Sequence, residues 1–173
     1  MAFDEKHTVQ DWLVKSLVGL GWTYEPATHL QRSNTDVLIE EDLMEALVVL
    51  NPAIGVDEER LDEVLPRIRG AVAAASTDGL VVANERLVTF MRGDVNHRYI
   101  GTPHDVPLRL VDFDDLANNT YIVSDEVVFG PPGDERRYDV VLFINGLPVV
   151  VIEAKTPVNS SVTWLKGAKD IAG

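Results

Sequence analysis

Two apolar runs on either side of a turn signal form the clearest pattern in this sequence. Val140–Ile144 and Pro148–Ile152 flank Asn145-Gly146, a dipeptide typical of tight β-turns. Each run is apolar at consecutive positions, as in central strands that are covered on both faces by helices. The pattern therefore predicts a β-hairpin inside a sheet.

Charged residues stand at the ends of this hairpin: Asp139 precedes the first run, and Glu153 and Lys155 follow the second. Opposite residues in an antiparallel pair share a face, and a shift of one residue reverses every side chain. An uninterrupted ladder closed by a two-residue loop would place Asp139 and Glu153 on different faces. We therefore predict a three-residue connection through Leu147, or an equivalent bulge, because either one brings the three charged residues to the same face.

The three-residue register also predicts individual partners across the hairpin. Its pairs are Ile144 with Pro148, Phe143 with Val149, Val141 with Val151, and Asp139 with Glu153.

The remaining chain divides into a helical first part and a later part with strands. Apolar spacing predicts helices over residues 4–20, 36–50, 57–75 and 84–92. Pro66 is expected to kink or divide the third helix. Alternation predicts strands over 106–111 and 121–129, the second broken at 124–126, and Asn159 or Ser160 can cap a final helix. We expect one domain over residues 1–173, an α/β fold with a mixed central sheet flanked by helices.

Composition narrows the functional class. The chain has no cysteine, which excludes disulfides and thiolate metal sites and suits the cytoplasm. No apolar run reaches the ~20 residues of a membrane helix, so no membrane partner is expected. The net charge of −13 argues against a nucleic-acid partner, but residues 136–173 sum to +2 and residues 1–135 to −15. The hairpin thus lies in the part of the chain that is not acidic.

The residues at the hairpin ends suit phosphodiester hydrolysis. Two carboxylates, Asp139 and Glu153, are the oxygen ligands that Mg²⁺ prefers, and the ion can activate a bound water. Lys155 can orient that water or stabilise the charge of the transition state. The alternative is a surface ion pair at a strand end, which usually contributes ~0–1 kcal/mol.

The segment RYDVVLFINGLPVVVIEAKTP, with Asp139 and Glu153-Ala154-Lys155, resembles the nuclease motif of the PD-(D/E)xK superfamily. More narrowly, it resembles the N-terminal region of the restriction (R) subunit of type I restriction enzymes. An opening helix with Glu5 ahead of Leu20-Gly21-Trp22 is similar as well, as is Val111-Asp112-Phe113 followed by Asn118 and Asn119. Tyr138 replaces the proline of the motif name, and the glutamine and tyrosine that often follow Lys155 have no counterparts here.

The resemblance implies a role for each matching residue. Asp139 and Glu153 become magnesium ligands, with the backbone carbonyl of Ala154 as a third, and Lys155 becomes the catalytic lysine. Glu5 becomes a supporting residue on the first helix, for which a favourable interaction with the helix dipole is the alternative.

The resemblance also implies a longer protein, in which ATP-driven motor domains follow this chain. No Gly-x4-Gly-Lys-Ser/Thr loop occurs here, so ATP would bind elsewhere in the full-length protein. The implied partners are double-stranded DNA and the methylation and specificity subunits of a restriction-modification complex. The fragment alone is expected to have weak nuclease activity or none.

Two other readings stay open. One is a catalytically inert DNA-binding or subunit-docking module that keeps the nuclease fold, and the other is a repair or recombination nuclease of the same superfamily. Lys166 and Lys169 can contact DNA phosphates or form a solvated helix face.

Some residues are given no part in a site. The histidines show no ligand spacing and are expected to be solvated or at helix ends: His7, His29, His97 and His104. Asp112, Asp114 and Asp115 lack the glycine and terminal glutamate of a calcium loop, so they are assigned to turn and cap roles.

Overall fold

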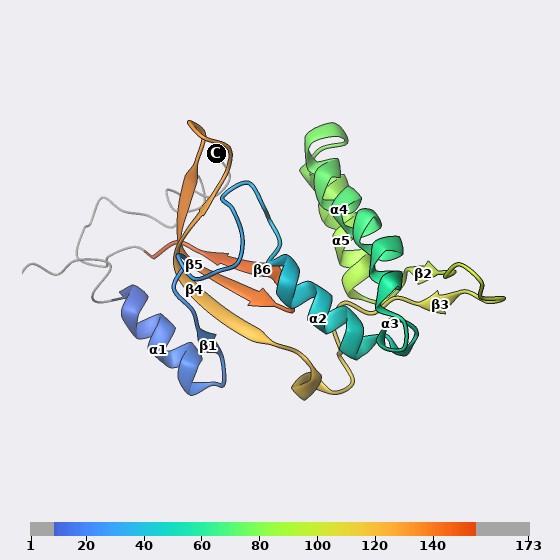
Figure 1. Cartoon of the computed structure of the whole chain (residues 1–173). Helices are drawn as coiled ribbons and strands as arrows, with labels where there is room; N and C mark the ends of the chain where they lie inside the picture. The colour runs from blue at the N-terminus through green and yellow to red at the C-terminus, as the bar shows by residue number, and fades with distance from the viewer. Residues whose placement is uncertain (1–8, 155–173) are drawn as a thin grey trace, which may run out of the picture. The chain divides into compact units, whose positions relative to one another are not determined.

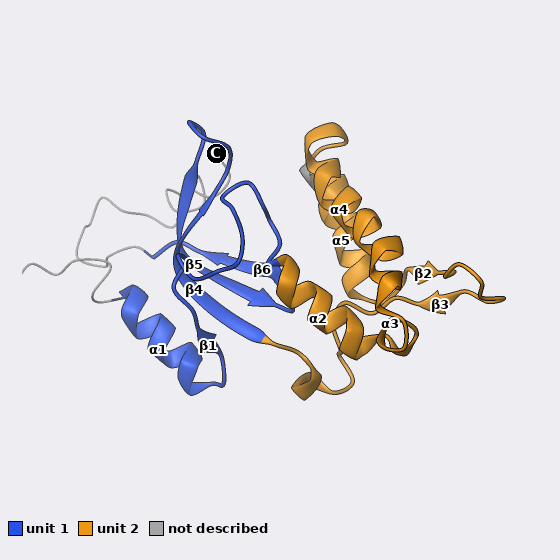
Figure 2. Cartoon of the chain, viewed as in Figure 1, with its two compact units in different colours: residues 1–39, 121–173 blue, residues 40–120 orange. Residues whose placement is uncertain are grey.

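The structure is a computed structural model that describes residues 9–154, apart from the side chain of Leu80 (Figure 1). The chain forms two compact units, one of residues 1–39 and 121–173 and the other of residues 40–120 (Figure 2). The expectation of a single domain over the whole chain stays a prediction. The helix expected to begin at Asn159 or Ser160 lies outside the described residues.

The first unit contains the hairpin, in a mixed sheet of four strands with the order β1-β4-β5-β6. Strand β1 runs parallel to β4, whereas the β4–β5 and β5–β6 pairs are antiparallel. The mixed sheet expected from the sequence is therefore confirmed. The elements of this unit are α1 (Asp11–Gly19), β1 (Thr23–Tyr24), β4 (Tyr121–Phe129), β5 (Arg136–Ile144) and β6 (Leu147–Ile152).

Both faces of β5 are buried around residues 140–143, as its apolar run predicted. The same prediction was wrong for the second run, because β6 is an edge strand of the described sheet and its Val150 is 43% exposed. On one face, Val140 and Leu142 pack with Val123 against the α1 residues Leu13 and Leu17. The other face has its own cluster, made of Leu30, Ile39, Val127, Val141 and Phe143. Leu30 and Ile39 belong to the irregular segment between β1 and α2, so a loop covers the face that α1 does not.

The second unit is mainly helical, and its long helices α4 and α5 lie side by side (Figure 1). Its elements are α2 (Glu40–Leu50), α3 (Pro52–Gly55), η2 (Glu58–Arg60), α4 (Leu61–Thr77), α5 (Leu80–Met91), β2 (Asn96–His97), β3 (Val106–Pro107) and η3 (Leu116–Asn118).

Several predicted boundaries in the helical part were wrong. Helix α2 begins at Glu40 instead of residue 36, because the side chain of Asp36 accepts hydrogen bonds from Ser33 and closes a turn there. Val37, an apolar residue within the predicted helix, lies before the observed helix and is 36% exposed. Helix α5 begins at Leu80, four residues before the expected start, and Pro66 does not divide α4.

The predicted strand over residues 106–111 is present only as β3, Val106–Pro107. The side chain of Asn51 explains where it ends. Its Oδ1 accepts from the Arg109 N–H at 2.8 Å, and its Nδ2 donates to the Arg109 carbonyl at 2.8 Å. Because one side chain satisfies both backbone groups, this segment needs no partner strand.

Within residues 9–154, no helix is both long enough and apolar enough to cross a membrane.

Candidate active site

The hairpin that presents the site closes through a two-residue turn. Asn145 and Gly146 have φ of 51° and 74°, and Ile144 pairs with Leu147. Positive φ at both central residues gives the turn that matches the twist of the two strands. The predicted three-residue connection is therefore wrong, and so are its pairs Ile144–Pro148 and Phe143–Val149.

A β-bulge in β6 shifts the register by the one residue that the two-residue turn does not supply. Phe143 pairs with Pro148 and Leu142 with Val150, which leaves Val149 as an extra residue in β6. Beyond the bulge, the Val141–Val151 pair is the one predicted, and Val140 pairs with Ile152. Continued by one residue, this register sets Asp139 across from Glu153. The bulge that the sequence argument allowed as an equivalent of the odd loop is thus confirmed.

The surroundings of Asp139 tie it to the end of β6 and to α1. Its Oδ2 accepts a hydrogen bond from the backbone N–H of Ala154 at 2.7 Å. Its backbone carbonyl accepts from Nε2 of Gln10 at 2.8 Å, and Gln10 is 2% exposed. Among residues 9–154, the second carboxylate oxygen of Asp139 accepts no hydrogen bond. One oxygen is therefore held by the protein, and residues 9–154 give the other oxygen no hydrogen-bond donor.

Of the other predicted site residues, the structure describes only Glu153 and Ala154. Glu153 is half-buried, and Ala154 is 5% exposed. Lys155, Glu5, Lys166 and Lys169 lie outside the described residues, so their predicted roles stay predictions.

Hard oxygen donors suit a magnesium ion at this end of the sheet. Asp139 and Glu153 supply carboxylates, and Mg²⁺ needs few protein ligands because it keeps several waters. Within the described ranges, no three His, Cys, Asp or Glu residues come close enough together to hold a metal. The residues present thus fit an ion held by two carboxylates, a carbonyl and water, and they do not form a closed cage.

Glu126 lies across from Asp139 on the opposite side of β5. Its neighbours Asp125 and Val127 pair with Val140 and Tyr138. Glu126 has a φ of 54°, in the left-handed region, although it lies in the middle of a strand. The side-chain alternation of β4 changes phase at this residue, since Val123 packs with the α1 face and Val127 with the other face.

The conformation of Glu126 is costly for a residue with a side chain, at roughly 1–2 kcal/mol. Its carboxylate forms an ion pair with the guanidinium of Arg137, with a distance of 2.6 Å between Oε2 and NH1. Arg137 is 64% exposed at its side chain, and an ion pair with an exposed partner contributes about 0–1 kcal/mol. This ion pair therefore does not offset the cost of the backbone conformation.

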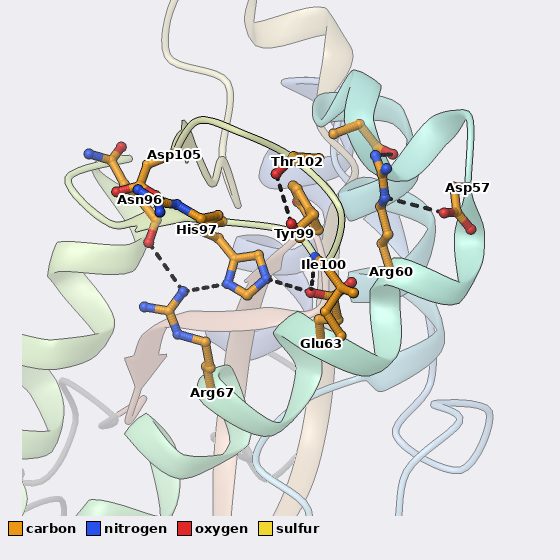
Figure 3. Close-up of polar contacts among 12 residues, drawn as sticks. Asp57, Arg60, Glu63, Arg67, Asn96, His97, Tyr99, Ile100, Thr102 and Asp105 are labelled. Atoms are coloured by element: carbon orange, nitrogen blue, oxygen red, sulfur yellow. Dashed lines mark hydrogen bonds and ion pairs between the residues drawn. The ribbon is translucent and has the colours of Figure 1, made fainter.

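The second unit contains a different polar cluster, in which His97 of β2 lies between two α4 residues (Figure 3). Nε2 of His97 lies 3.3 Å from Oε2 of Glu63, and Nδ1 lies 2.8 Å from NH1 of Arg67. Arginine can only donate, so Nδ1 accepts and Nε2 carries the proton. The expectation that His97 is solvated or at a helix end was wrong, although both of its nitrogens are used by protein groups and it is not a ligand here.

The aspartates of residues 112–115 form a turn, as expected. Asp112 is 8% exposed, and its Oδ1 accepts the N–H groups of Asp114 and Asp115 while Oδ2 accepts from the side chain of Asn118. The hydrogen bond from Asn118, followed by that from the Asp115 N–H, lowers the pKa of Asp112 below its usual value. Its carboxylate is fully used inside the loop.

Sequence reasoning missed Gln10 and Glu126, although each left a signal. Gln10 is the N-cap of α1 and lies three and four residues before Leu13 and Val14, in line with the apolar stripe of the helix, where a polar side chain needs a partner. Glu126 belongs to the polar interruption noted at 124–126. The strand does not end there, but the backbone of Glu126 adopts a left-handed conformation within it.

Comparisons with known proteins agree with this reading of the sequence. The family described as the type I restriction enzyme R protein N terminus matches residues 2–172. The endonuclease subunit of the HindI type I restriction enzyme of Haemophilus influenzae is 28% identical over 93% of the chain. A Methanocaldococcus jannaschii protein named for the endonuclease subunit of the type I enzyme MjaIXP is 22% identical over 89% of the chain.

The chain spans 16% of the length of the HindI subunit and 15% of the MjaIXP relative. No solved structure matches it. Since the family match extends over nearly every residue, this chain belongs to the family of type I restriction enzyme R protein N termini.

Proposed function

We propose that this chain is the magnesium-dependent endonuclease domain of a type I restriction enzyme R subunit and cuts DNA phosphodiesters. The proposal rests on one observation above all. The bulge at Val149 sets Asp139 across from Glu153, and the Ala154 N–H holds one oxygen of Asp139. Two carboxylates where the pairing of adjacent strands ends, with a lysine two residues after Glu153, are the parts that a PD-(D/E)xK nuclease needs.

Each residue has a separate task in this proposal. Asp139 and Glu153 hold the magnesium ion, with the carbonyl of Ala154 as a third donor. When bound, the ion lowers the pKa of a water and neutralises charge on the phosphate. Lys155 orients the attacking water and stabilises the negative charge that builds on the phosphoryl oxygens. Gln10 keeps the backbone of Asp139 in place through its carbonyl.

The whole protein would supply the rest of the reaction. ATP-driven motor domains outside this chain would translocate double-stranded DNA, and methylation and specificity subunits would select the site. On this account the domain cuts when the complex presents DNA to it, and alone it is weakly active or inactive.

The decisive test uses the complete R subunit with its partner subunits, ATP and magnesium. Asp139→Ala and Lys155→Ala should each abolish cleavage while ATP hydrolysis continues. Asp114→Ala is the matched control, because that carboxylate is 87% exposed in the other unit and should be dispensable. Undiminished cleavage by either of the first two variants would contradict the proposal.

The acidic character of the first 135 residues, with a charge of −15, favours a second candidate, an inert module that docks on another subunit. A manganese titration separates the two. If the chain is the nuclease, manganese should bind and Asp139→Ala should remove that binding. If the chain is an inert docking module, no manganese binding that depends on Asp139 should be seen. The family match argues against the third reading, a separate repair or recombination nuclease.

A further inference from the structure

We propose that a hollow beside α1 receives a basic segment from the part of the R polypeptide that follows this chain. The inference rests on the proposed function, because it takes the chain as one domain of a longer R subunit. The hollow lies in the first unit and has a volume of about 480 Å³. The described residues that line this α1 hollow come from α1, β1 and β4: Asp11, Val14, Lys15, Val18, Tyr24 and Asp125.

Helix α1 is only partly covered by the described part of the chain. Its Leu13, Val14 and Leu17 pack on the sheet, yet no residue of the helix is fully buried. On the side of the α1 hollow, Val18 is 44% exposed and Tyr24 of β1 is 43% exposed. Apolar surface that is gathered in a hollow, and not scattered singly, is typical of a binding site.

The polar groups of the α1 hollow favour a cation. Asp11 and Asp125 supply two carboxylates against the single ammonium of Lys15. The hydroxyl of Tyr24 donates to Oδ1 of Asp125 at 2.8 Å. Burial and this hydrogen bond, followed by the negative charges of Asp125 and Asp11, raise the pKa of Tyr24 to about 12. The potential at Tyr24 is therefore negative, so the hollow attracts a lysine or arginine side chain and repels a DNA phosphate.

The size of the α1 hollow favours a segment of the same polypeptide over a separate subunit. Stable interfaces between separate proteins bury about 1,200–2,000 Å², far more than a hollow with room for a few side chains provides. A segment of the same chain is present at an effective concentration of roughly millimolar, so a weak contact is sufficient. This chain spans 16% of the length of the HindI subunit, so most of a protein of that length lies outside it.

These properties define the occupant by its chemistry. A lysine or arginine of the segment meets the carboxylates of Asp11 and Asp125. A neighbouring aliphatic residue covers the exposed apolar surface of Val18 and Tyr24.

The α1 hollow adjoins the candidate active site. Asp125 pairs with Val140, the residue that follows Asp139. Asp11 follows Gln10, whose side chain donates to the backbone carbonyl of Asp139. A segment held in the hollow therefore fixes this end of the sheet relative to the motor part that delivers the DNA.

The test replaces Val18 in the complete R subunit with p-benzoylphenylalanine, which bonds to neighbouring C–H groups under ultraviolet light. Digestion and mass spectrometry should identify a peptide that contains lysine or arginine and comes from beyond residue 173 of the same polypeptide. Because a bulky group at Val18 takes up part of the hollow, a second reporter replaces Lys15. The matched control is the same reporter at Val49, which is 67% exposed on α2 in the other unit and should not capture that peptide.

The contribution of charge is tested separately. Asp125→Asn keeps an acceptor for the Tyr24 hydroxyl but removes the negative charge, so it should lower the yield of the cross-link about threefold. Raising the salt concentration from about 0.1 M to about 1 M should lower the yield in the parent and have less effect in this variant. A yield that neither change affects would overturn the charge complementarity.

The identity of the captured peptide decides the proposal. Capture of residues 155–173, of another subunit or of DNA would overturn it, and so would the absence of any cross-link from both Val18 and Lys15. Asp139→Ala tests the proposed function through cleavage and should leave the cross-link unchanged. Failure of the docking contact is thus distinguishable from failure of the proposed function.

Discussion

Asp139 in the first unit is half-buried and Asp112 in the second is buried, and both carboxylates accept from backbone N–H groups, but they are held in different ways. Asp112 accepts three hydrogen bonds, all from residues within six positions of it. The one carboxylate hydrogen bond that residues 9–154 give Asp139 comes from Ala154, fifteen positions later. The local loop gives both carboxylate oxygens of Asp112 a partner, whereas within residues 9–154 one carboxylate oxygen of Asp139 accepts no hydrogen bond.

The difference follows from the backbone around each residue. In a turn, the N–H groups two and three residues ahead point back toward the aspartate side chain. In a strand, neighbouring N–H groups belong to the ladder, so a carboxylate at its end is satisfied by another strand or by a ligand. An acid at the end of paired strands is therefore a better candidate for metal binding than an acidic loop with more carboxylates.

The largest expected effect separates the two acids by substitution. Asp139→Asn should lower DNA cleavage by the complete enzyme about a hundredfold to a thousandfold, because a lost metal ligand removes several kcal/mol of transition-state stabilisation. Asp112→Asn should leave the cleavage rate of the folded protein within about twofold and lower its melting temperature instead. Cleavage rates and melting temperatures should be measured for both variants. If both variants lost cleavage and stability to the same extent, the proposed difference between Asp139 and Asp112 would be contradicted.

The next prediction concerns the register that brings Asp139 and Glu153 together. Inserting one alanine after Ile152 should move Glu153 to the other face and reduce cleavage nearly as much as Asp139→Asn does. Deleting Val149 is the control, since it removes the unpaired residue and keeps Asp139 across from Glu153. That deletion should retain cleavage while unfolding becomes easier by about 1–2 kcal/mol, because the side chain of Val149 packs on the α1 face.

A smaller effect is expected at Gln10. Gln10→Ala removes the donor to the Asp139 carbonyl and should lower cleavage about tenfold, as for residues that orient metal ligands. Gln10→Glu keeps the size but cannot donate when ionised, so it should not restore the rate. Apparent magnesium affinity should weaken in both variants, and unchanged magnesium dependence would show that Gln10 serves the fold alone.

The smallest effect is a pH dependence of Asp112. Its pKa is lower in the folded chain than in the unfolded chain, so the ionised form favours folding. Its contribution is complete above the ordinary aspartate pKa, about 4, and disappears as the pH falls through the lowered folded value. Urea midpoints of the parent and Asp112→Asn should therefore differ at pH 7 and converge in acid. A constant difference down to low pH would contradict this account.

The candidate site shows how much of the structure can be predicted from the pattern of residues. Apolar runs, Asn145-Gly146 and the charges at both ends predicted the hairpin, the buried faces of its first strand and the need for one extra residue. The sequence did not say whether that residue lies in the loop or in the strand. Both solutions satisfy the same alternation, and the choice depends on the match between turn twist and strand twist.

The turns and the presence of the helices could be predicted from the sequence, because interactions between neighbouring residues decide them. The turn at Asp112 was predictable for this reason. The strand expected over residues 106–111 failed because Asn51, 58 residues from Arg109, satisfies the backbone there. Long-range hydrogen bonds of this kind leave no periodic pattern in the chain.

The sequence by itself singled out the candidate site residues, since the positions of the carboxylates and the lysine at the ends of two apolar runs are fixed by their spacing. Tertiary structure alone decided how Asp139 is held: Gln10, directly before α1, donates to its carbonyl, the N–H of Ala154 donates to its carboxylate, and Glu126 lies across from it. These partners are 129, 15 and 13 positions away in the chain. Folding brings them together because the sheet needs paired strands and α1 covers one of its apolar faces.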